Sequence, residues 1–367
     1  MKFRCDRDAL SEALQIVQRG VSSRPGIPAL TGVLLEATAE GELTLTTTDL
    51  EVSARLTIAV TVTEPGSALV PARLLGDTVK SLSDAPVEFD ADQAQAQIRC
   101  AAYEGALRLL PAEDFPTLQQ PSGTRVVVEA PRFAEAIAQV ARAASRDEAR
   151  PVLTGVLVEI SREGLTLVAT DSYRLAVREL IATAGGEAKA IVPERAMTEA
   201  GRGASGIDKG DIELFVDDSQ VSFQLGALTL TSRLIEGEFP NYRGLLPERY
   251  ENRLSVSRQQ LMDAVKRVGL LARDTAPVRL EFNALGVKLS SQSPDLGQAV
   301  EAVEASYEGE DITAAFNPNY LADGLAASIG DTVRLEVRDG LKPGIVRGDS
   351  DEFTYLVMPV RLPTPVG

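Results

Sequence analysis

The sequence predicts an α+β fold in which three similar domains follow one another along the chain. Three observations predict it: a long internal repeat, an amphipathic stripe at the start of each copy, and alternating strand patterns between the helices. The predicted domains are residues 1–122, 123–249 and 250–367, each of roughly 120 residues, a usual size for a domain with its own core. We expect short, turn-like links between them at 119–123 and 246–250.

The internal repeat is the strongest of these observations. Residues 28–36, PALTGVLLE, return at 151–159 as PVLTGVLVE, and residues 40–49 are matched by 163–171, which also end in Thr-Asp. In both copies a Val-Pro pair follows, with its proline 22 residues after the aspartate. A repeat of this length exceeds the period of about 20–50 residues found in solenoids, so each copy is expected to be a domain. The third copy keeps the order of elements but has lost the Thr-Asp pair.

Two helices are predicted in each copy. The first helix has apolar residues at i, i+4 and i+7, which form one face of an amphipathic helix. These stripes are Leu10, Leu14 and Val17; Phe133, Ile137 and Val140; and Leu261, Val265 and Val268. The second helix follows a proline, whose missing N–H costs nothing in a first turn. The six helical windows are 7–20, 72–80, 131–146, 194–205, 257–273 and 317–329.

Strands are indicated by alternation of polar and apolar residues, as at 42–46 and 220–225. Each copy therefore reads as a strand, a helix, several strands, a second helix and several more strands. This order predicts antiparallel meanders and differs from the strict strand–helix alternation of a doubly wound sheet.

Composition excludes several classes of enzyme. The chain has no histidine, which removes Ser-His-Asp and Cys-His nucleophiles and the usual zinc sites. No Gly-Lys-Ser/Thr phosphate loop is present, and the GRGASG motif at 201–206 follows a helical pattern where a dinucleotide site needs a strand. Cys5 and Cys100 are expected to be buried free thiols. No run of about 18 apolar residues or signal peptide is seen, so we expect a cytoplasmic chain without a membrane partner.

The 53 acidic residues leave a carboxylate enzyme open. Asp49 and Asp171 are the equivalent candidates in the two copies, yet a Thr-Asp step at a strand end usually bonds backbone N–H groups in a turn. We therefore interpret both as structural. A three-domain carboxylate hydrolase acting on an anionic or sugar substrate, and a tandem-domain scaffold that does not contact DNA, remain as alternatives.

Several motifs together resemble one family over nearly the whole chain. They are MKF at 1–3, SRP with IP at 23–28, TDLE at 48–51, VPAR at 70–73, PAEDFP at 111–116, ATDSYRLAV at 169–177, GEFPNYR at 237–243 and YLVMPVRL at 355–362. In this order they resemble the bacterial DNA polymerase III beta subunit, the β sliding clamp. The resemblance implies a DNA-clamp fold, with two chains closing head to tail into a six-domain ring. Helices would line the hole, antiparallel sheets would lie outside, and no catalysis, cofactor or metal would be needed.

The resemblance also implies partners. These are encircled double-stranded DNA, the DNA polymerase III alpha subunit, the clamp loader, other polymerases and repair proteins with short linear motifs, and a second copy of the chain. The charge distribution suits a helix-lined hole that surrounds DNA. The whole chain has a formal net charge of −16, of which the six helical windows contribute +5 and the remainder −21. A weakly basic lining attracts phosphates, and an acidic exterior discourages binding elsewhere. The residues expected to face DNA are Arg24, Arg73, Lys80, Arg142, Arg146, Arg195, Arg202, Lys266 and Arg267.

A partner-peptide groove between the second and third domains is implied as well. By match of motif it comprises Leu153, Thr170, Ser172, Tyr173, Arg174, Leu175, Pro240, Leu245, Leu356, Met358, Pro359 and Val360. The chain departs from the family pattern at Gly244, where many members have arginine, and at Tyr173, so its motif preference is open. A tail at 363–367 runs beyond the usual end, and we expect it to modulate access to the groove.

Ring closure requires an edge of the first domain to meet an edge of the third in a heterologous contact. By match of position, the expected interface residues are Leu107 and Arg108 on one side and Leu270 and Leu271 on the other.

Overall fold

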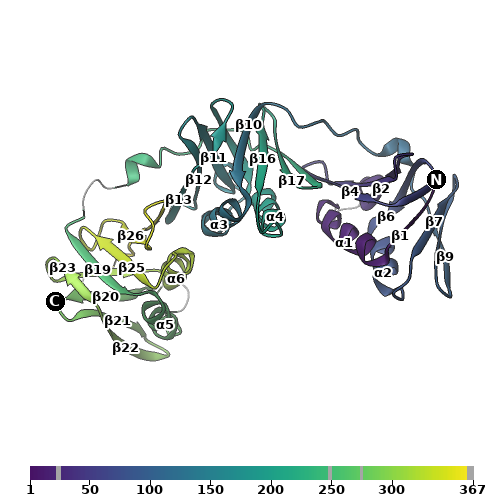
Figure 1. Cartoon of the computed structure of the whole chain (residues 1–367). Coiled ribbons are helices and arrows are strands. Elements are labelled where there is room, and N and C mark those ends of the chain that lie inside the picture. Colours follow the sequence, from purple (N-terminus) through teal and green to yellow (C-terminus); the bar gives the residue numbers. More distant parts are fainter. Residues whose placement is uncertain (22–25, 247–249, 273–275, 362–367) are drawn as a thin grey trace. The chain divides into compact units, whose positions relative to one another are not determined.

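The computed structural model describes residues 1–21, 26–246, 250–272 and 276–361, and Figure 1 shows its elements in chain order. Arg24 and the 363–367 tail lie outside the described residues. Within them the α-helices are α1 (Arg7–Val17), α2 (Ala72–Ser81), α3 (Ala130–Val140), α4 (Glu194–Ser205), α5 (Arg258–Gly269) and α6 (Pro318–Ala327). Four lie within the predicted windows, and α2 and α3 each extend one residue beyond theirs, which confirms the helical pattern. Short 3-10 turns extend α1 through Gly20 and α3 through Ala143.

The order of elements is the same three times: one strand, a helix, five strands, a helix and three strands. The first copy contains β1 (Lys2–Cys5), β2 (Gly32–Ala37), β3 (Glu42–Thr48), β4 (Val52–Ala59), β5 (Thr61–Glu64), β6 (Gly66–Pro71), β7 (Val87–Ala91), β8 (Gln95–Cys100) and β9 (Tyr103–Arg108). The second contains β10 (Thr124–Glu129), β11 (Gly155–Ser161), β12 (Gly164–Thr170), β13 (Arg174–Leu180), β14 (Thr183–Ala184), β15 (Ala188–Pro193), β16 (Asp211–Val216), β17 (Gln220–Leu225) and β18 (Leu228–Arg233). The third contains β19 (Asn252–Ser257), β20 (Val278–Asn283), β21 (Gly286–Ser293), β22 (Gly297–Glu304), β23 (Ser306–Glu308), β24 (Ile312–Phe316), β25 (Thr332–Val337), β26 (Gly344–Arg347) and β27 (Phe353–Val357).

Local chemistry explains where several helices begin. Asp6 caps α1 by accepting a hydrogen bond from the backbone N–H of Ala9 at 3.0 Å. Ser257 caps α5 in the same way. Asn317 caps α6 with Pro318 as its first residue, where the missing N–H leaves nothing unsatisfied.

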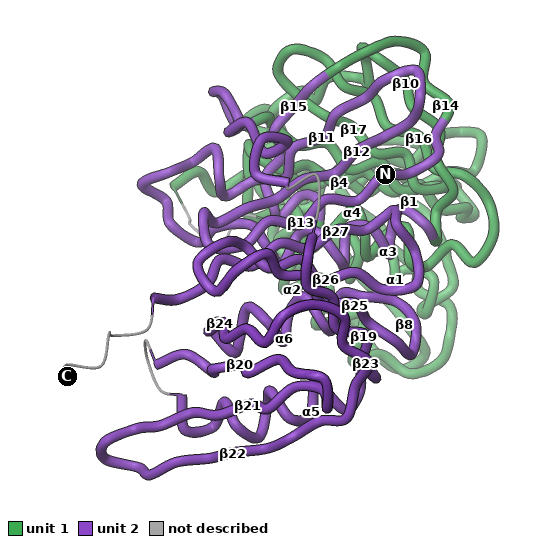
Figure 2. The backbone as a smooth tube through the Cα atoms, turned by 90° about the vertical axis from the view of Figure 1, so that its left-hand side faces the viewer, with its two compact units in different colours: residues 1–131, 183–188, 198–234 green, residues 132–182, 189–197, 235–367 purple. Residues whose placement is uncertain are grey.

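The strands form four antiparallel sheets in two compact units, which are coloured separately in Figure 2. The first unit contains a five-stranded sheet, β5-β1-β7-β8-β9, and a nine-stranded sheet, β14-β10-β16-β17-β18-β4-β3-β2-β6. The second contains a four-stranded sheet, β22-β21-β20-β24, and a nine-stranded sheet, β15-β11-β12-β13-β27-β26-β25-β19-β23. The predicted α+β class with antiparallel meanders is confirmed.

Each nine-stranded sheet joins strands from two copies of the repeat. In the first unit β4 pairs with β18, and in the second unit β13 pairs with β27. Hydrogen bonding therefore continues across the predicted domain boundaries, so the edge strands of neighbouring repeats satisfy one another. The boundaries at 122 and 249 remain predictions about the chain and do not divide the sheets.

Two smaller expectations concern the cysteines and the glycine motif. Cys5 and Cys100 are buried and free, and burial raises the pKa of the Cys5 thiol to about 12. Helix α4 runs through the GRGASG segment, and a side chain at Gly203 would meet Leu225 at 2.6 Å. The glycine therefore serves close packing of the helix on β17. In the described part of the chain no helix has the length and apolar character needed to cross a bilayer.

Candidate functional site

The Thr-Asp step forms the same turn in both copies where it occurs. Oδ1 of Asp49 accepts hydrogen bonds from the backbone of Glu51 at 3.1 Å and Val52 at 2.7 Å. Oδ1 of Asp171 accepts from Tyr173 at 2.9 Å and from Arg174 at 3.0 Å. The residue after each aspartate has a positive φ, 75° at Leu50 and 79° at Ser172. These carboxylates close turns, as the sequence predicted.

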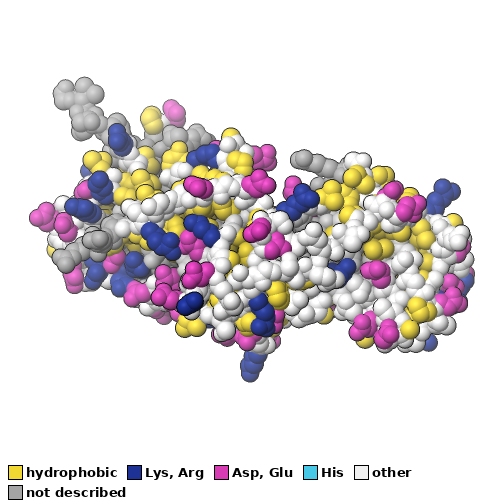
Figure 3. Space-filling view, turned by 90° about the horizontal axis from the view of Figure 1, so that it is seen from above, with side chains coloured by type: hydrophobic (Ala, Val, Ile, Leu, Met, Phe, Trp, Pro, Cys, Tyr) yellow, Lys and Arg dark blue, Asp and Glu magenta, His cyan; other side chains and the backbone are white. Residues whose placement is uncertain are grey.

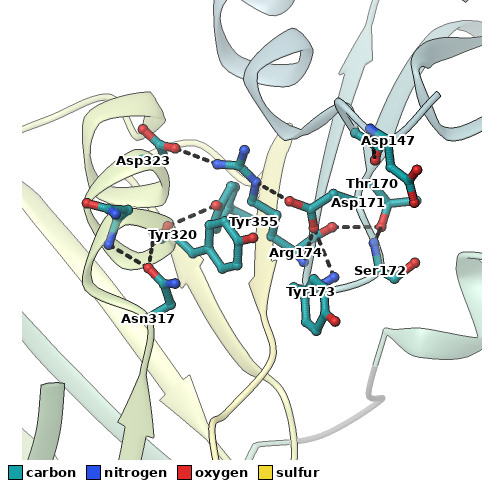
Figure 4. A network of polar contacts seen from close by, with 12 residues as sticks. Asp147, Thr170, Asp171, Ser172, Tyr173, Arg174, Asn317, Tyr320, Asp323 and Tyr355 are labelled. Carbon is teal, nitrogen blue, oxygen red and sulfur yellow. Dashed lines mark hydrogen bonds and ion pairs between the residues drawn. The ribbon is translucent and has the colours of Figure 1, made fainter. Parts of the chain in front are cut away.

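The second copy contains a polar network centred on Arg174. Arg174 stands where the first copy has Val52, and its Nε donates to Oδ2 of Asp171 at 3.0 Å. Its Nη1 donates to Asp323 on α6, and its guanidinium lies 4.7 Å from the centre of the Tyr320 ring. Figure 4 shows Arg174 between the turn and α6. The side chain is only 12% exposed, so one arginine connects the second and third repeats inside the second unit.

Tyr173 continues this connection at the surface. Its ring stacks on Tyr320 with centroids 6.3 Å apart, yet the residue is 59% exposed. Its backbone carbonyl accepts a hydrogen bond from the N–H of Met358 at 2.8 Å. The neighbouring Tyr355 hydroxyl donates to the Tyr320 carbonyl at 2.8 Å, and burial raises the pKa of this phenol. The turn therefore presents an aromatic ring and a methionine side by side.

Beneath this surface lies an apolar core cluster formed by the second nine-stranded sheet and the segment that follows β18. It includes Leu157, Val168, Leu175, Val177, Ile191, Phe239, Tyr242, Ile345 and Leu356. Three predicted groove residues, Leu153, Leu175 and Leu356, are 5%, 1% and 2% exposed. Their side chains therefore have almost no accessible surface in this structure and lie beneath the exposed residues, and their place in the groove stays a prediction.

Other predicted groove residues do reach the surface. Leu245 is 51% and Met358 38% exposed, and Pro240 and Ser172 are exposed as well. Pro359 and Val360 are half-buried, while Thr170 is buried and donates from its hydroxyl to the Arg174 carbonyl at 2.7 Å. Pro240, Leu245 and Met358 are exposed apolar side chains, and Ser172 adds a polar group, a combination suited to an extended peptide with a few large apolar residues.

The segment that carries Pro240 and Leu245 is anchored by Glu159 on β11. The Tyr242 hydroxyl donates to Glu159 at 2.8 Å, Arg243 pairs with it at 2.7 Å and Lys189 at 3.3 Å. Burial alone would raise the pKa of Glu159, but these three hydrogen bonds outweigh burial and lower it. The ionised carboxylate therefore fixes the segment against the sheet.

Sequence reasoning missed some members of the site. Tyr320 and Asp323 lie on α6, about 150 residues from the turn they contact, and no local pattern marks them. Arg150 also touches the turn, since its Nη1 donates to the Ser172 hydroxyl at 3.0 Å and its Nε to Asp147 at 2.8 Å. Only their residue types, a tyrosine, an aspartate and an arginine, were visible in the sequence.

The described residues predicted to face DNA are all exposed and lie on helices or the turns that follow them. Arg73 and Lys80 are on α2, Arg142 and Arg146 follow α3, Arg195 and Arg202 are on α4, and Lys266 and Arg267 are on α5. Arg202 pairs with Glu199 at 2.7 Å and Arg267 with Glu301 at 2.6 Å, so both of these charges are partly neutralised. On the face seen in Figure 3, cationic and anionic side chains are interspersed.

Among the residues that the structure describes, β9 and β22 are edge strands of the two smaller sheets. Leu107 on β9 is 9% exposed, whereas Arg108 is exposed. Leu270, at the end of α5, is 76% exposed, and Leu271 is half-buried. Within the second unit, α5 packs beside β22, so an exposed leucine lies near an unpaired edge.

Comparison with known proteins decides the family. Profiles of the N-terminal, central and C-terminal domains of the DNA polymerase III beta subunit match residues 1–119, 127–241 and 243–361, in that order. The chain belongs to the DNA polymerase III beta subunit family. Among curated relatives, the family member named β sliding clamp in Streptomyces coelicolor is 38% identical, and the match covers 99% of this chain and 100% of that protein.

Solved structures of the family agree. The sliding clamp from Pseudomonas aeruginosa, bound to griselimycin, superposes with a TM-score of 0.94 at 31% identity. The sliding clamp from Bacillus subtilis gives 0.93 at 30%. Each comparison covers 99% of this chain and 100% of the other chain. The DNA-clamp fold with three similar domains is thereby confirmed.

Proposed function

We propose that this chain is a processivity factor of DNA replication. It forms a ring-shaped homodimer that encircles duplex DNA, slides on it and tethers the replicative polymerase. The observation that carries this proposal is the full-length match to relatives named β sliding clamps, with all three domains in order. The chain acts as an accessory subunit and not as an enzyme. The hydrolase alternative is not favoured, since Asp49 and Asp171 both serve turn hydrogen bonds.

The exposed groove surface is the proposed docking site for partners. We define it as Ser172, Tyr173, Pro240, Leu245 and Met358. DNA polymerase III alpha subunit, the clamp loader, other polymerases and repair proteins would each place a short linear motif there. The apolar side chains offer contact area, and the methionine adapts to different ligands.

The proposed contacts with DNA are few and weak. Arg73, Lys80, Arg146 and Lys266 are exposed and present point charges to phosphates, while Arg267 shares its charge with Glu301. Each phosphate contact adds a salt-dependent contribution to DNA affinity. A small number of such contacts therefore keeps the affinity low enough for the protein to slide. Closure of the ring, and not affinity, would retain the DNA.

Ring closure is proposed to pair the β9 edge of one chain with the β22 edge of a second. In the described part of the chain each edge has a neighbouring strand on one side only, and an open edge of this kind is a template for another strand. The contact is heterologous and closes after two copies.

Primer extension on a singly primed circular template tests this function. With the clamp loader and the replicative polymerase, addition of the chain should lengthen the products. The Met358→Ala, Leu245→Ala double variant should shorten them, while Leu341→Ala, which removes a 72% exposed leucine outside the groove, should not. Products of unchanged length with and without the wild-type chain would reject the proposal.

A further inference from the structure

A cavity lies in the first unit, on the nine-stranded sheet beneath residues 118–121. Its volume is about 70 Å³. Its floor is formed by side chains of three adjacent strands: Arg55 on β4, Thr229 and Thr231 on β18, and Gln224 on β17. Thr229 stands directly opposite both Arg55 and Gln224 in the ladder, so these side chains share one face of the sheet.

The duplication places this cavity at the position that corresponds to the groove core in the second unit. In the first unit Ser53 pairs with Thr231, and in the second unit Leu175 pairs with Leu356. Ser53 and Leu175 each lie four residues after the aspartate of the Thr-Asp turn. The two sites are therefore the same place in two copies of one fold.

The chemistry of the two places is opposite. Where the second unit has the apolar pair Leu175 and Leu356, the first has the hydroxyls of Ser53 and Thr231. Two residues further along the strand, Val177 is replaced by Arg55. The apolar floor of one site has become a hydrogen-bonding floor in the other, so the ligands of the two sites must differ in chemical class.

The electrostatics of the cavity select an anion. Arg55 supplies its single formal charge, because no aspartate or glutamate is among the lining residues, all of which are described. Within the described part of the chain, Arg55 has no ion pair, and its Nε is buried without a hydrogen-bond partner. A guanidinium without an ion pair favours a polar or anionic partner where its side chain lines the cavity.

Further donors lie beside Arg55. The hydroxyls of Ser53 and Thr231 are already engaged, with Thr48 at 2.8 Å and Ser222 at 2.9 Å respectively. Thr229 and Gln224 have no such side-chain bond to another described residue, so an O–H and an N–H₂ remain beside the guanidinium. Donors arranged in this way match the two oxygens of a carboxylate.

We propose that this cavity binds the carboxylate of a small organic acid, held by Arg55 with Thr229 and Gln224. The volume exceeds the roughly 10–15 Å³ of cavity that one water needs and suits a group of a few heavy atoms. One guanidinium balances the single charge of a carboxylate, whereas phosphate carries more than one negative charge near neutral pH. The proposal is independent of the clamp function.

Methyl NMR of the full-length chain with labelled threonine tests this site, because Thr229 and Thr231 report from within it. Acetate is titrated at constant ionic strength against chloride, with acetamide as the uncharged match and inorganic phosphate as the competing oxyanion. We expect both methyl signals to shift saturably with acetate, not with acetamide, and less tightly with phosphate. Arg55→Gln should weaken acetate binding at least about tenfold, because a charge-assisted hydrogen bond is lost.

Arg162→Gln is the matched control, since Arg162 is exposed in the β11–β12 turn, and it should bind acetate like the wild type. If Arg55→Gln does not fold, Thr229→Val, read from the Thr231 methyl, should weaken binding in its place. Shifts that do not saturate, an equal response to acetamide, or tighter binding of phosphate would overturn the carboxylate assignment. None of these results bears on retention of DNA by a ring, so the two proposals fail separately.

Discussion

Arg174 Nε donates to Oδ2 of Asp171 at 3.0 Å, while Oδ1 of the same carboxylate closes the turn that contains both residues. In the first repeat, Asp49 closes the same turn, but Val52 occupies the position of Arg174. One substitution within a duplicated turn therefore creates a cation that also reaches Asp323 and Tyr320 on α6. The proposed docking surface lies at this difference between the two copies.

Replacing Arg174 tests whether it fastens α6 to the turn. Arg174→Ala should lower the free energy of unfolding by about 3 kcal/mol, because it leaves the largely buried Asp171 carboxylate without its cation. Urea denaturation followed by circular dichroism measures the change. Arg162→Ala, at an exposed turn, should change stability by less than about 0.5 kcal/mol. An equally small effect at Arg174 would contradict this role.

Tyr173 is predicted to act on binding and not on stability. Because its ring is 59% exposed, Tyr173→Ala should cost only about 0.5–1 kcal/mol of stability through the lost stack on Tyr320. The affinity for a fluorescent peptide that carries a clamp-binding motif should fall about tenfold or more. Tyr173→Phe keeps the ring and should bind like the wild type. A tenfold loss in Tyr173→Phe would show that the hydroxyl, and not the ring, makes the contact.

The anchor at Glu159 predicts a pH dependence. Hydrogen bonds from Tyr242, Arg243 and Lys189 hold its pKa below the ordinary value of 4.5 in the folded chain. Its contribution to stability is therefore fully present above pH 4.5 and is lost as the pH falls through the lower, folded-state pKa. Glu159→Gln should be less stable than the wild type by about 1 kcal/mol at pH 7, and the difference should shrink below pH 4.5.

Urea denaturation at pH 7, 5 and 3.5 measures this difference. Glu163→Gln, at an exposed turn residue, is the control and should differ little from the wild type at every pH. A gap between Glu159→Gln and the wild type that stays constant from pH 7 to 3.5 would mean that the carboxylate charge does not hold the segment.

The proposed interface at the end of α5 predicts weaker dimerisation in a double variant. Leu270→Ala with Leu271→Ala removes apolar area that is exposed in the single chain and would be buried in the dimer. The dimer dissociation constant should rise at least about tenfold in analytical ultracentrifugation, by the usual value of buried apolar surface. Leu341→Ala removes an equally exposed leucine elsewhere and should leave it unchanged. An unaltered dimer in the double variant would place the interface elsewhere.

Much of the fold was predictable from the sequence because its helices and turns are formed by residues that are close together in the chain. The stripes Leu10–Leu14–Val17 and Leu261–Val265–Val268 gave the helices directly, since their residues are all buried in α1 and α5. The Thr-Asp turns were also local, because the carboxylate of Asp49 or Asp171 bonds backbone groups only two and three residues away.

The site was less predictable because its contacts are distant in the chain. Nothing near Asp323 marks it as a partner of Arg174, and alternation alone did not reveal that Leu175 and Leu356 pair across β13 and β27 in the core. In the first unit the corresponding pair is Ser53 and Thr231, which are also distant in the chain. The sequence therefore did not indicate the polar cavity that they line. Register between repeats, and not composition, decides which side chains meet.

Retention on DNA of defined topology tests the central claim most directly. The chain is loaded by its clamp loader onto a nicked circular plasmid, the complex is isolated by gel filtration, and one half is then linearised with a restriction enzyme. A closed ring should stay with the circle through a wash at high salt and leave after linearisation, since only topology holds it. Equal retention on circular and linear DNA, or loss from both, would contradict a ring that encircles DNA.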